Sequence, residues 1–178
     1  PDVVIRNENR ARRVVDLGMT VISGVEHGWS GRVIEIYQLA KQYGIKPLFG
    51  TEAYFVMDRH DKKDKTNSHL IVLAKNENGR KAINRILSEA NVTGYYYKAR
   101  VDLELLFTLP KNDIWLTSAC LGGIWKYENY EEIFSQIISY FGENFFFEVQ
   151  THPVEQQKEI NKKVLELSKK YGVKYMAG

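Results

Sequence analysis

The chain contains 178 residues, which is enough for one domain with a buried core. Its 25 basic and 22 acidic side chains nearly balance, so it lacks the strongly basic composition typical of a dedicated nucleic-acid-binding protein. No apolar run is long enough to cross a bilayer, no signal peptide opens the sequence, and the single cysteine excludes an internal disulfide. We therefore expect one cytoplasmic domain over residues 1–178, without a membrane partner.

Short apolar runs alternate with amphipathic stretches along the chain. After a polar, arginine-rich segment at 5–16, residues 20–25 have the pattern of a buried strand. The helical spacing of apolar residues then predicts a helix over 30–43, with Ser30 as its cap and Gly44 as its end. The first third of the chain therefore predicts a strand followed by a helix.

Further strands and helices follow in alternation. A second strand is expected over 46–55, interrupted at 50–52, and the stretch 57–68 is expected to be a solvated loop because its charges nearly cancel. The later apolar runs predict strands at 69–74, 114–119, 145–150 and 173–177, and helices at 76–90, 131–141 and 155–171. Strands separated by helices favour parallel pairing, so a doubly wound sheet and a β/α barrel remain as alternatives.

Potential metal ligands stand where several of these strands end. They are Glu26, His27, Glu52, Cys120 and His152, and His69 comes just before its strand. Active sites of β/α barrels form at the carboxyl ends of the strands, from residues far apart in sequence. Imidazole, carboxylate and thiolate groups suit zinc-like ions, and carboxylates also suit manganese or magnesium. Taken singly, each residue has a structural alternative, as a hydrogen-bonded histidine or a small buried cysteine.

A cluster of aromatic and basic residues lies at 95–100. Tyr96 could stack on a base while Lys98 and Arg100 pair with phosphates, which makes these three residues candidate nucleic-acid contacts. The alternative, which we favour, is an irregular connection packed against the barrel with its two charges in solvent.

Six stretches of the sequence carry a more specific pattern. They are VEHG at 25–28, GIKPLFGTEAYF at 44–55, HLIVLAKNENG at 69–79, GYYYKARVD at 94–102, SACLGG at 118–123 and ENFFFEVQTH at 143–152. In order and separation they resemble the PHP domain of bacterial DNA polymerase III alpha subunits. The resemblance covers nearly the whole chain.

This resemblance implies an α/β fold, a PHP-type (β/α)7 barrel, whose rim binds divalent ions: zinc or manganese, with magnesium as a further option. The ligands it implies are His27, Glu52, His69, Cys120 and His152. Glu26 stands where the family more often has Asp, so we expect it beside the ligands rather than on an ion. The family's opening H-x-H and closing Asp-x-His motifs have no counterpart here. We therefore expect the chain to lack the first strand and the end of the last motif.

The function implied by the resemblance is that of a metal-dependent phosphoesterase, a 3′–5′ exonuclease within a bacterial or phage replicative DNA polymerase. No side chain beyond the metal ligands is expected to be catalytic, with ion-bound water as the nucleophile. The implied partners are DNA through the parent polymerase, the remaining polymerase domains, an exonuclease subunit and a sliding clamp. One alternative is a catalytically silent scaffold that binds an editing partner, and another is a small-molecule phosphatase of the same superfamily. Alone, residues 1–178 are expected to be inactive, poor in metal and prone to aggregation.

Overall fold

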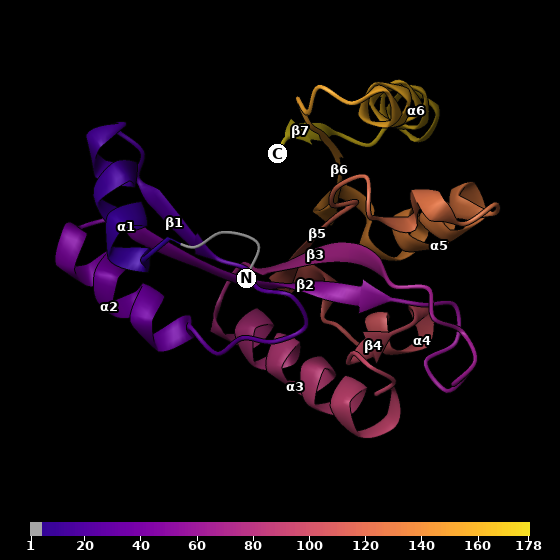
Figure 1. Cartoon of the computed structure of the whole chain (residues 1–178), viewed down its shortest axis with the longest axis horizontal. Coiled ribbons are helices and arrows are strands. Elements are labelled where there is room, and N and C mark those ends of the chain that lie inside the picture. The colour runs from indigo at the N-terminus through magenta and orange to yellow at the C-terminus, as the bar shows by residue number, and fades with distance from the viewer. Residues whose placement is uncertain (1–4) are drawn as a thin grey trace.

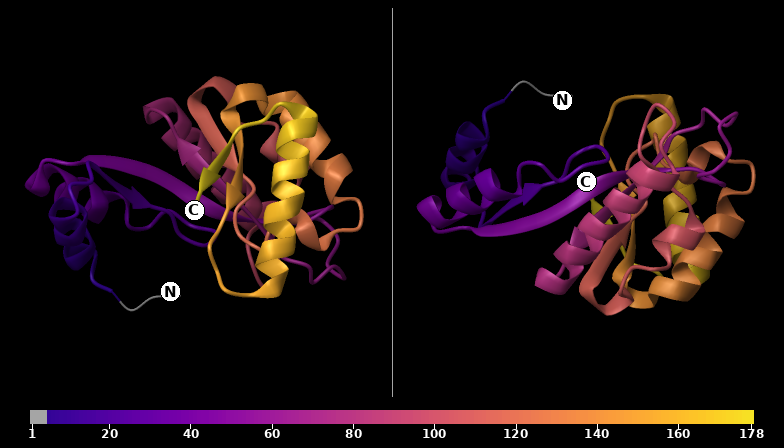
Figure 2. Two further views of the ribbon diagram at one scale, coloured as in Figure 1. Left: turned by 90° about the horizontal axis from the view of Figure 1, so that it is seen from above. Right: turned by 90° about the horizontal axis from the view of Figure 1, so that it is seen from below.

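A curled sheet of seven strands forms the centre of the computed structural model, which describes residues 5–178 (Figure 1). Six strands follow the order β1-β2-β3-β5-β6-β7, and β4 pairs with β2. The sheet bends instead of lying flat, and helices pack against it, so the fold is a partial β/α barrel (Figure 2). This agrees with the α/β barrel expected from the sequence.

The strands are β1 Val21–Gly24, β2 Lys46–Phe55, β3 Ser68–Ala74, β4 Arg100–Val101, β5 Ile114–Thr117, β6 Phe145–Val149 and β7 Tyr175–Ala177. The α-helices are α1 Asn7–Asp16, α2 Val33–Tyr43, α3 Glu77–Thr93, α4 Leu103–Leu106, α5 Tyr130–Phe141 and α6 Glu155–Tyr171. Short 3-10 helices span Lys111–Asp113, Ile124–Lys126 and Gly142–Asn144. Every strand and helix predicted from the apolar pattern is present, with ends shifted by a few residues.

Two local predictions around α2 and β2 were wrong. Ser30 does not cap α2, because the helix begins after Arg32 and the Ser30 hydroxyl donates instead to Oδ1 of Asn84, 2.9 Å away. Strand β2 is continuous, and the expected interruption at 50–52 is absent because β3 pairs with this part of the strand. Gly44 does end α2, in the left-handed conformation with φ of 65°, as the sequence predicts.

The direction of β3 is the main departure from the expected parallel sheet. β3 runs antiparallel to both β2 and β5, whereas β1–β2, β2–β4, β5–β6 and β6–β7 are parallel pairs. No helix separates β2 from β3. The loop at 56–67 therefore reverses the chain, and β3 lies beside β2 as its antiparallel neighbour. The start of β3 therefore lies at the same end of the sheet as the ends of β2 and β5.

The stretch 94–106 holds two short elements that the sequence did not predict, β4 and α4. Asp102 caps α4 by accepting a hydrogen bond of 3.0 Å from the backbone N–H of Leu105. Its carboxylate also pairs with the buried Arg59, at 2.7 Å, and so ties the 56–67 loop to the domain. The loop has no strand or helix, as expected, but it is anchored at its base.

Two groups of apolar side chains form the interior. The larger lies between β2–β6 and helices α3, α4, α5 and α6, and it includes Phe55, Leu70, Phe134 and Phe147. The smaller packs α1 and α2 against β1, around Ile22 and Ile36. No helix of residues 5–178 is long and apolar enough to cross a membrane.

Candidate metal centre

Glu52 lies at the centre of the candidate site because β1 and β2 continue to pair beyond the end of β1. The backbone N–H of Glu52 donates to the carbonyl of Glu26 at 2.8 Å, and the N–H of Gly28 donates to the carbonyl of Glu52 at 2.9 Å. These two bonds place His27 beside Glu52 as a parallel bridge. The strand ladder thus fixes the backbone of both side chains.

His69 lies at the same end of the sheet as Glu52, near the start of the antiparallel strand β3. It pairs with Tyr54 across the β2–β3 ladder, and its N–H donates to the carbonyl of Gly122 at 3.1 Å. A Cβ atom at Gly122 would lie 3.2 Å from Nδ1 of His69 and 3.3 Å from Sγ of Cys120, so a side chain here would crowd both groups. Because β3 is antiparallel, a residue at the start of this strand meets residues at the ends of its neighbours.

Cys120 follows β5 on a turn with an unusual backbone. Ala119 has φ of 54°, a left-handed conformation that non-glycine residues seldom adopt. The N–H of Ala119 donates to the Thr117 hydroxyl at 3.3 Å, and that hydroxyl donates to the carboxylate of the buried Glu148. The Cys120 sulfur accepts a hydrogen bond of 3.2 Å from the N–H of Gly122. The turn therefore directs the thiol towards His69.

Three side chains bring ligand atoms into one small volume. One ligand atom from each of His27, Glu52 and His69 lies within 4.8 Å of the other two. Nε2 of His27 is 3.6 Å from Oε2 of Glu52, and Nδ1 of His69 is 2.9 Å from Oε1 of Glu52. Ligands that share one ion at about 2.1 Å lie up to about 4.2 Å apart, so small side-chain adjustments would let these three bind an ion.

Charge at this site is set by neighbouring groups. Hydrogen bonds to Cys120 and then to Glu52 raise the pKa of His69 to about 9, against the opposing effect of burial. The hydrogen bond from His69 lowers the pKa of the Cys120 thiol. His69 therefore carries its extra proton at neutral pH, and its hydrogen bond favours ionisation of the Cys120 thiol. Nδ1 of His69 is buried and lies 2.9 Å from Oε1 of Glu52, so the nitrogen is directed at the carboxylate.

Tyr54 contributes to the site although sequence reasoning did not single it out. Its ring stacks on His27 with centroids 5.8 Å apart and meets His69 edge-on at 5.4 Å. The signal was present in the sequence, because Tyr54 follows Glu52 by two residues on the same strand, and such residues share a face of the sheet.

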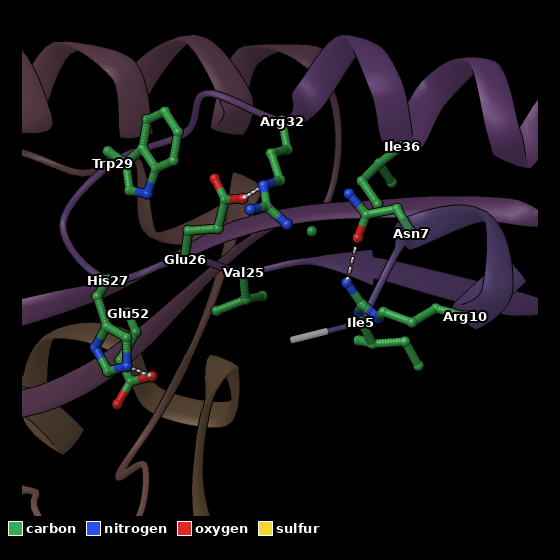
Figure 3. Close-up of a pocket in the computed structure, with 11 residues that line it drawn as sticks. Ile5, Asn7, Arg10, Val25, Glu26, His27, Trp29, Arg32, Ile36 and Glu52 are labelled. Atoms are coloured by element: carbon green, nitrogen blue, oxygen red, sulfur yellow. Dashed lines mark hydrogen bonds and ion pairs between the residues drawn. The ribbon is translucent and has the colours of Figure 1, made fainter. Parts of the chain in front are cut away.

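A cavity of about 530 Å³ adjoins the His27 and Glu52 side chains (Figure 3). Arg10, Trp29 and Arg32 are among the residues that line it. Glu26 points into this cavity and pairs with Arg32, with Nε and Oε1 3.0 Å apart. Glu26 thus lies next to His27 in the chain but balances the charge of an arginine.

The remaining predicted site residues are not members of the group formed by His27, Glu52 and His69. His152 is exposed in the loop after β6 and is outside the group formed by His27, Glu52 and His69.

Arg100 is fully buried, so the expectation that its charge contacts nucleic acid or solvent was wrong. Its guanidinium donates to backbone carbonyls because the 56–67 loop folds over it. Tyr96 is half-buried with its ring over Arg100, 5.3 Å from Cζ, whereas Lys98 is exposed.

Comparisons with known proteins show which family the sequence matches. Residues 2–152 match the family described as PHP domain. The DNA polymerase III subunit alpha of Aquifex aeolicus is 32% identical over 99% of this chain, and that of Thermus aquaticus is 33% identical over 85%. The chain spans only 16% and 13% of the length of these two relatives.

A similar fold occurs in a solved structure of a protein from Bifidobacterium adolescentis, assigned as a metal-dependent phosphoesterase. The TM-score is 0.59 at 14% identity, over 96% of this chain and 80% of the other. At this identity the likeness concerns the fold.

Proposed function

The chain belongs to the PHP domain family, and on this basis we propose that it is a metal-dependent phosphoesterase domain of a bacterial replicative DNA polymerase, with 3′–5′ exonuclease activity. The observation that carries the proposal is the convergence of His27, Glu52 and His69 on one small volume. The similarity to polymerase III alpha subunits over nearly the whole chain supports the replicative role. The partners that this role implies are DNA, the remaining polymerase domains, an exonuclease subunit and a sliding clamp.

The residues at the site fit a divalent metal ion. Two imidazoles and a carboxylate converge, with a thiol hydrogen-bonded to one imidazole, and this set of ligand types suits zinc or manganese. A bound ion would supply positive charge for the phosphate oxygens and lower the pKa of a water molecule. We propose His27, Glu52, His69 and Cys120 as its holders, with His152 joining if its exposed loop moves inward.

The side chains have separate tasks in this proposal. Glu52 is flanked by both imidazoles, so its carboxylate orients them and offsets positive charge. His69 must give up its extra proton before its nitrogen can bind an ion. Cys120 must lose its proton to bind as a thiolate, and the lowered pKa of the thiol makes that loss easier. Tyr54 limits the movement of both imidazole rings by packing against them.

Metal affinity is the first test. Glu52→Gln keeps the size of the side chain but removes its charge, so the dissociation constant for Mn²⁺ or Zn²⁺ should rise at least roughly 100-fold. Glu77→Gln is the matched control, because Glu77 is an exposed residue of α3 that pairs with Arg80. Isothermal titration calorimetry measures both variants. Equal affinity in Glu52→Gln and the wild type would exclude Glu52 as a ligand.

Hydrolysis is the second test, made on the longer polymerase that carries these residues. A 5′-labelled single-stranded DNA should be shortened from its 3′ end in the presence of Mn²⁺ or Zn²⁺, and His152→Ala should abolish this while nucleotide incorporation continues. Metal bound at the site without any hydrolysis would favour the second candidate, a scaffold that stabilises the polymerase and binds an editing partner. The exposed position of His152, apart from the other ligands, is the observation that favours this alternative.

A further inference from the structure

Lys98 is held on a rigid turn at the edge of the candidate metal centre. The N–H of Tyr96 donates to the carbonyl of Lys98 at 3.0 Å across Tyr97, whose φ is 60°. Immediately after the turn, Ala99 and Arg100 are buried, and the Arg100 guanidinium donates to four backbone carbonyls. The backbone that carries Lys98 is therefore fixed at both ends of the turn.

The Lys98 ammonium lies beside the aromatic ring that packs on both histidines. Its Nζ is 5.1 Å from the centroid of the Tyr54 ring, and that ring contacts His27 and His69. A single aromatic ring thus separates this cation from the imidazoles of the site. Within residues 5–178, no carboxylate forms an ion pair with Lys98, and its side chain is exposed.

An exposed lysine with this placement has two explanations. It could only cover the Tyr54 ring, since a cation over an aromatic face is weakly attractive. A solvated ammonium gains little from such a contact. A phosphoester bound at the cluster would bring anionic oxygens to the same edge, and a flexible lysine is well suited to bind phosphate as a point charge.

We propose that Lys98 binds the anionic phosphoryl oxygens of the substrate at the His27–Glu52–His69 site, as a phosphate-binding residue separate from the metal ligands. This inference rests on the proposed phosphoesterase function and adds a specific contact for the substrate. It also gives the two basic residues of the predicted nucleic-acid cluster different roles. Arg100 is buried and fixes the turn, whereas the Lys98 ammonium lies over the Tyr54 ring and is exposed.

The test uses the longer polymerase that carries these residues. Calorimetry measures its binding of Mn²⁺ and then the binding of inorganic phosphate to the Mn²⁺-loaded protein. Lys98→Gln should weaken phosphate binding roughly tenfold or more, the value of one charge-assisted hydrogen bond, and leave Mn²⁺ affinity unchanged. Lys98→Arg should retain most of the affinity because it keeps the charge. Lys41→Gln, an exposed lysine on α2, makes the same change in net charge away from the site and should match the wild type.

The salt dependence of phosphate binding gives a second test. If Lys98 only covered the Tyr54 ring, this dependence would be the same in the wild type and in Lys98→Gln. Phosphate affinity should fall more steeply with ionic strength in the wild type than in Lys98→Gln. Unchanged phosphate and Mn²⁺ affinity in Lys98→Gln would overturn the role of Lys98 and leave the proposed function intact. Mn²⁺ affinity that is the same in the wild-type polymerase and in its Glu52→Gln variant, with no phosphate binding in either, would overturn both proposals.

Discussion

The Thr117 hydroxyl joins the turn that carries Cys120 to the buried Glu148. The hydroxyl accepts from the N–H of Ala119 and donates to the buried carboxylate of Glu148. Gln150 supplies a weaker hydrogen bond to the same carboxylate, at 3.3 Å. One hydroxyl thus stabilises a left-handed turn and satisfies a buried charge.

Replacing Thr117 by Val should therefore be costly although the two side chains have the same shape. We expect a loss of about 2 kcal/mol in the free energy of unfolding, because a buried carboxylate oxygen loses its donor. Urea unfolding measures this loss, with Thr151→Val as the control, since Thr151 is exposed. Equal stability of Thr117→Val and the wild type would mean that the turn does not depend on this hydroxyl.

Asp102 gives the fold a defined dependence on acid. Burial raises the pKa of Asp102, but hydrogen bonds from the N–H groups of Leu105 and Arg59 and from the Arg59 guanidinium outweigh it, so the pKa lies below the ordinary 3.8. A carboxyl with a lower pKa in the folded state stabilises the fold above its unfolded pKa. That contribution is lost as the pH falls below 3.8 towards the folded pKa.

Asp102→Asn should show this dependence directly. The gap in unfolding free energy between the wild type and this variant should be constant above about pH 4 and should close at lower pH. Urea unfolding across a pH series measures the gap, with Asp16→Asn as an exposed control. A gap that stays constant at the lowest pH would contradict the lowered pKa.

At the scale of elements, Arg100 organises the segments on both sides of β4. It is fully buried and donates to the carbonyls of Arg59, Asp61, Asp64 and Gly94. One side chain therefore joins the end of α3, the strand β4 and the 56–67 loop. A guanidinium suits this position because it presents several donors in a fixed plane.

Arg100→Lys should therefore strongly destabilise the fold, although the substitution retains the positive charge. A lysine cannot reach all four carbonyls, so we expect a loss of at least about 3 kcal/mol in unfolding free energy. Amide hydrogen exchange should accelerate first in the 56–67 loop. Arg85→Lys, at an exposed position on α3, should leave both measurements unchanged. Normal protection of the loop in Arg100→Lys would show that other contacts hold it.

At the scale of the whole molecule, the curled sheet has two open edges. Within residues 5–178, β1 pairs with β2 alone and β7 with β6 alone. Val21 on β1 and Tyr175 and Met176 on β7 are exposed. Unpaired strand edges with apolar side chains are sites where chains associate.

The 178-residue chain should therefore associate as its concentration rises. Val21→Lys should reduce this association, because charge on an edge strand opposes pairing with a second chain. Val92→Lys makes the same substitution on α3, away from both edges, and should have no such effect. Light scattering over a concentration series distinguishes the two variants. A chain that remains monomeric throughout would show that its edges are protected.

The sequence by itself determined the order and type of nearly all elements, because apolar periodicity and helix-ending glycines act within a few residues. It also determined the kinds of ligand available, since residue types at strand ends can be read without a fold. Tyr54 could have been added from its spacing to Glu52 alone. The short β4 and α4 escaped prediction because two to four residues are too few to show a period.

The tertiary structure alone decided which of these groups meet. His69 joins His27 and Glu52 because the 56–67 loop returns the chain in the antiparallel direction, and this direction has no local signature. The same loop buries Arg100, whose charge looked solvated in the sequence. His152 follows a strand like the other candidates, yet its loop leaves it exposed. Burial and convergence depend on contacts between distant residues, and only the folded chain specifies those contacts.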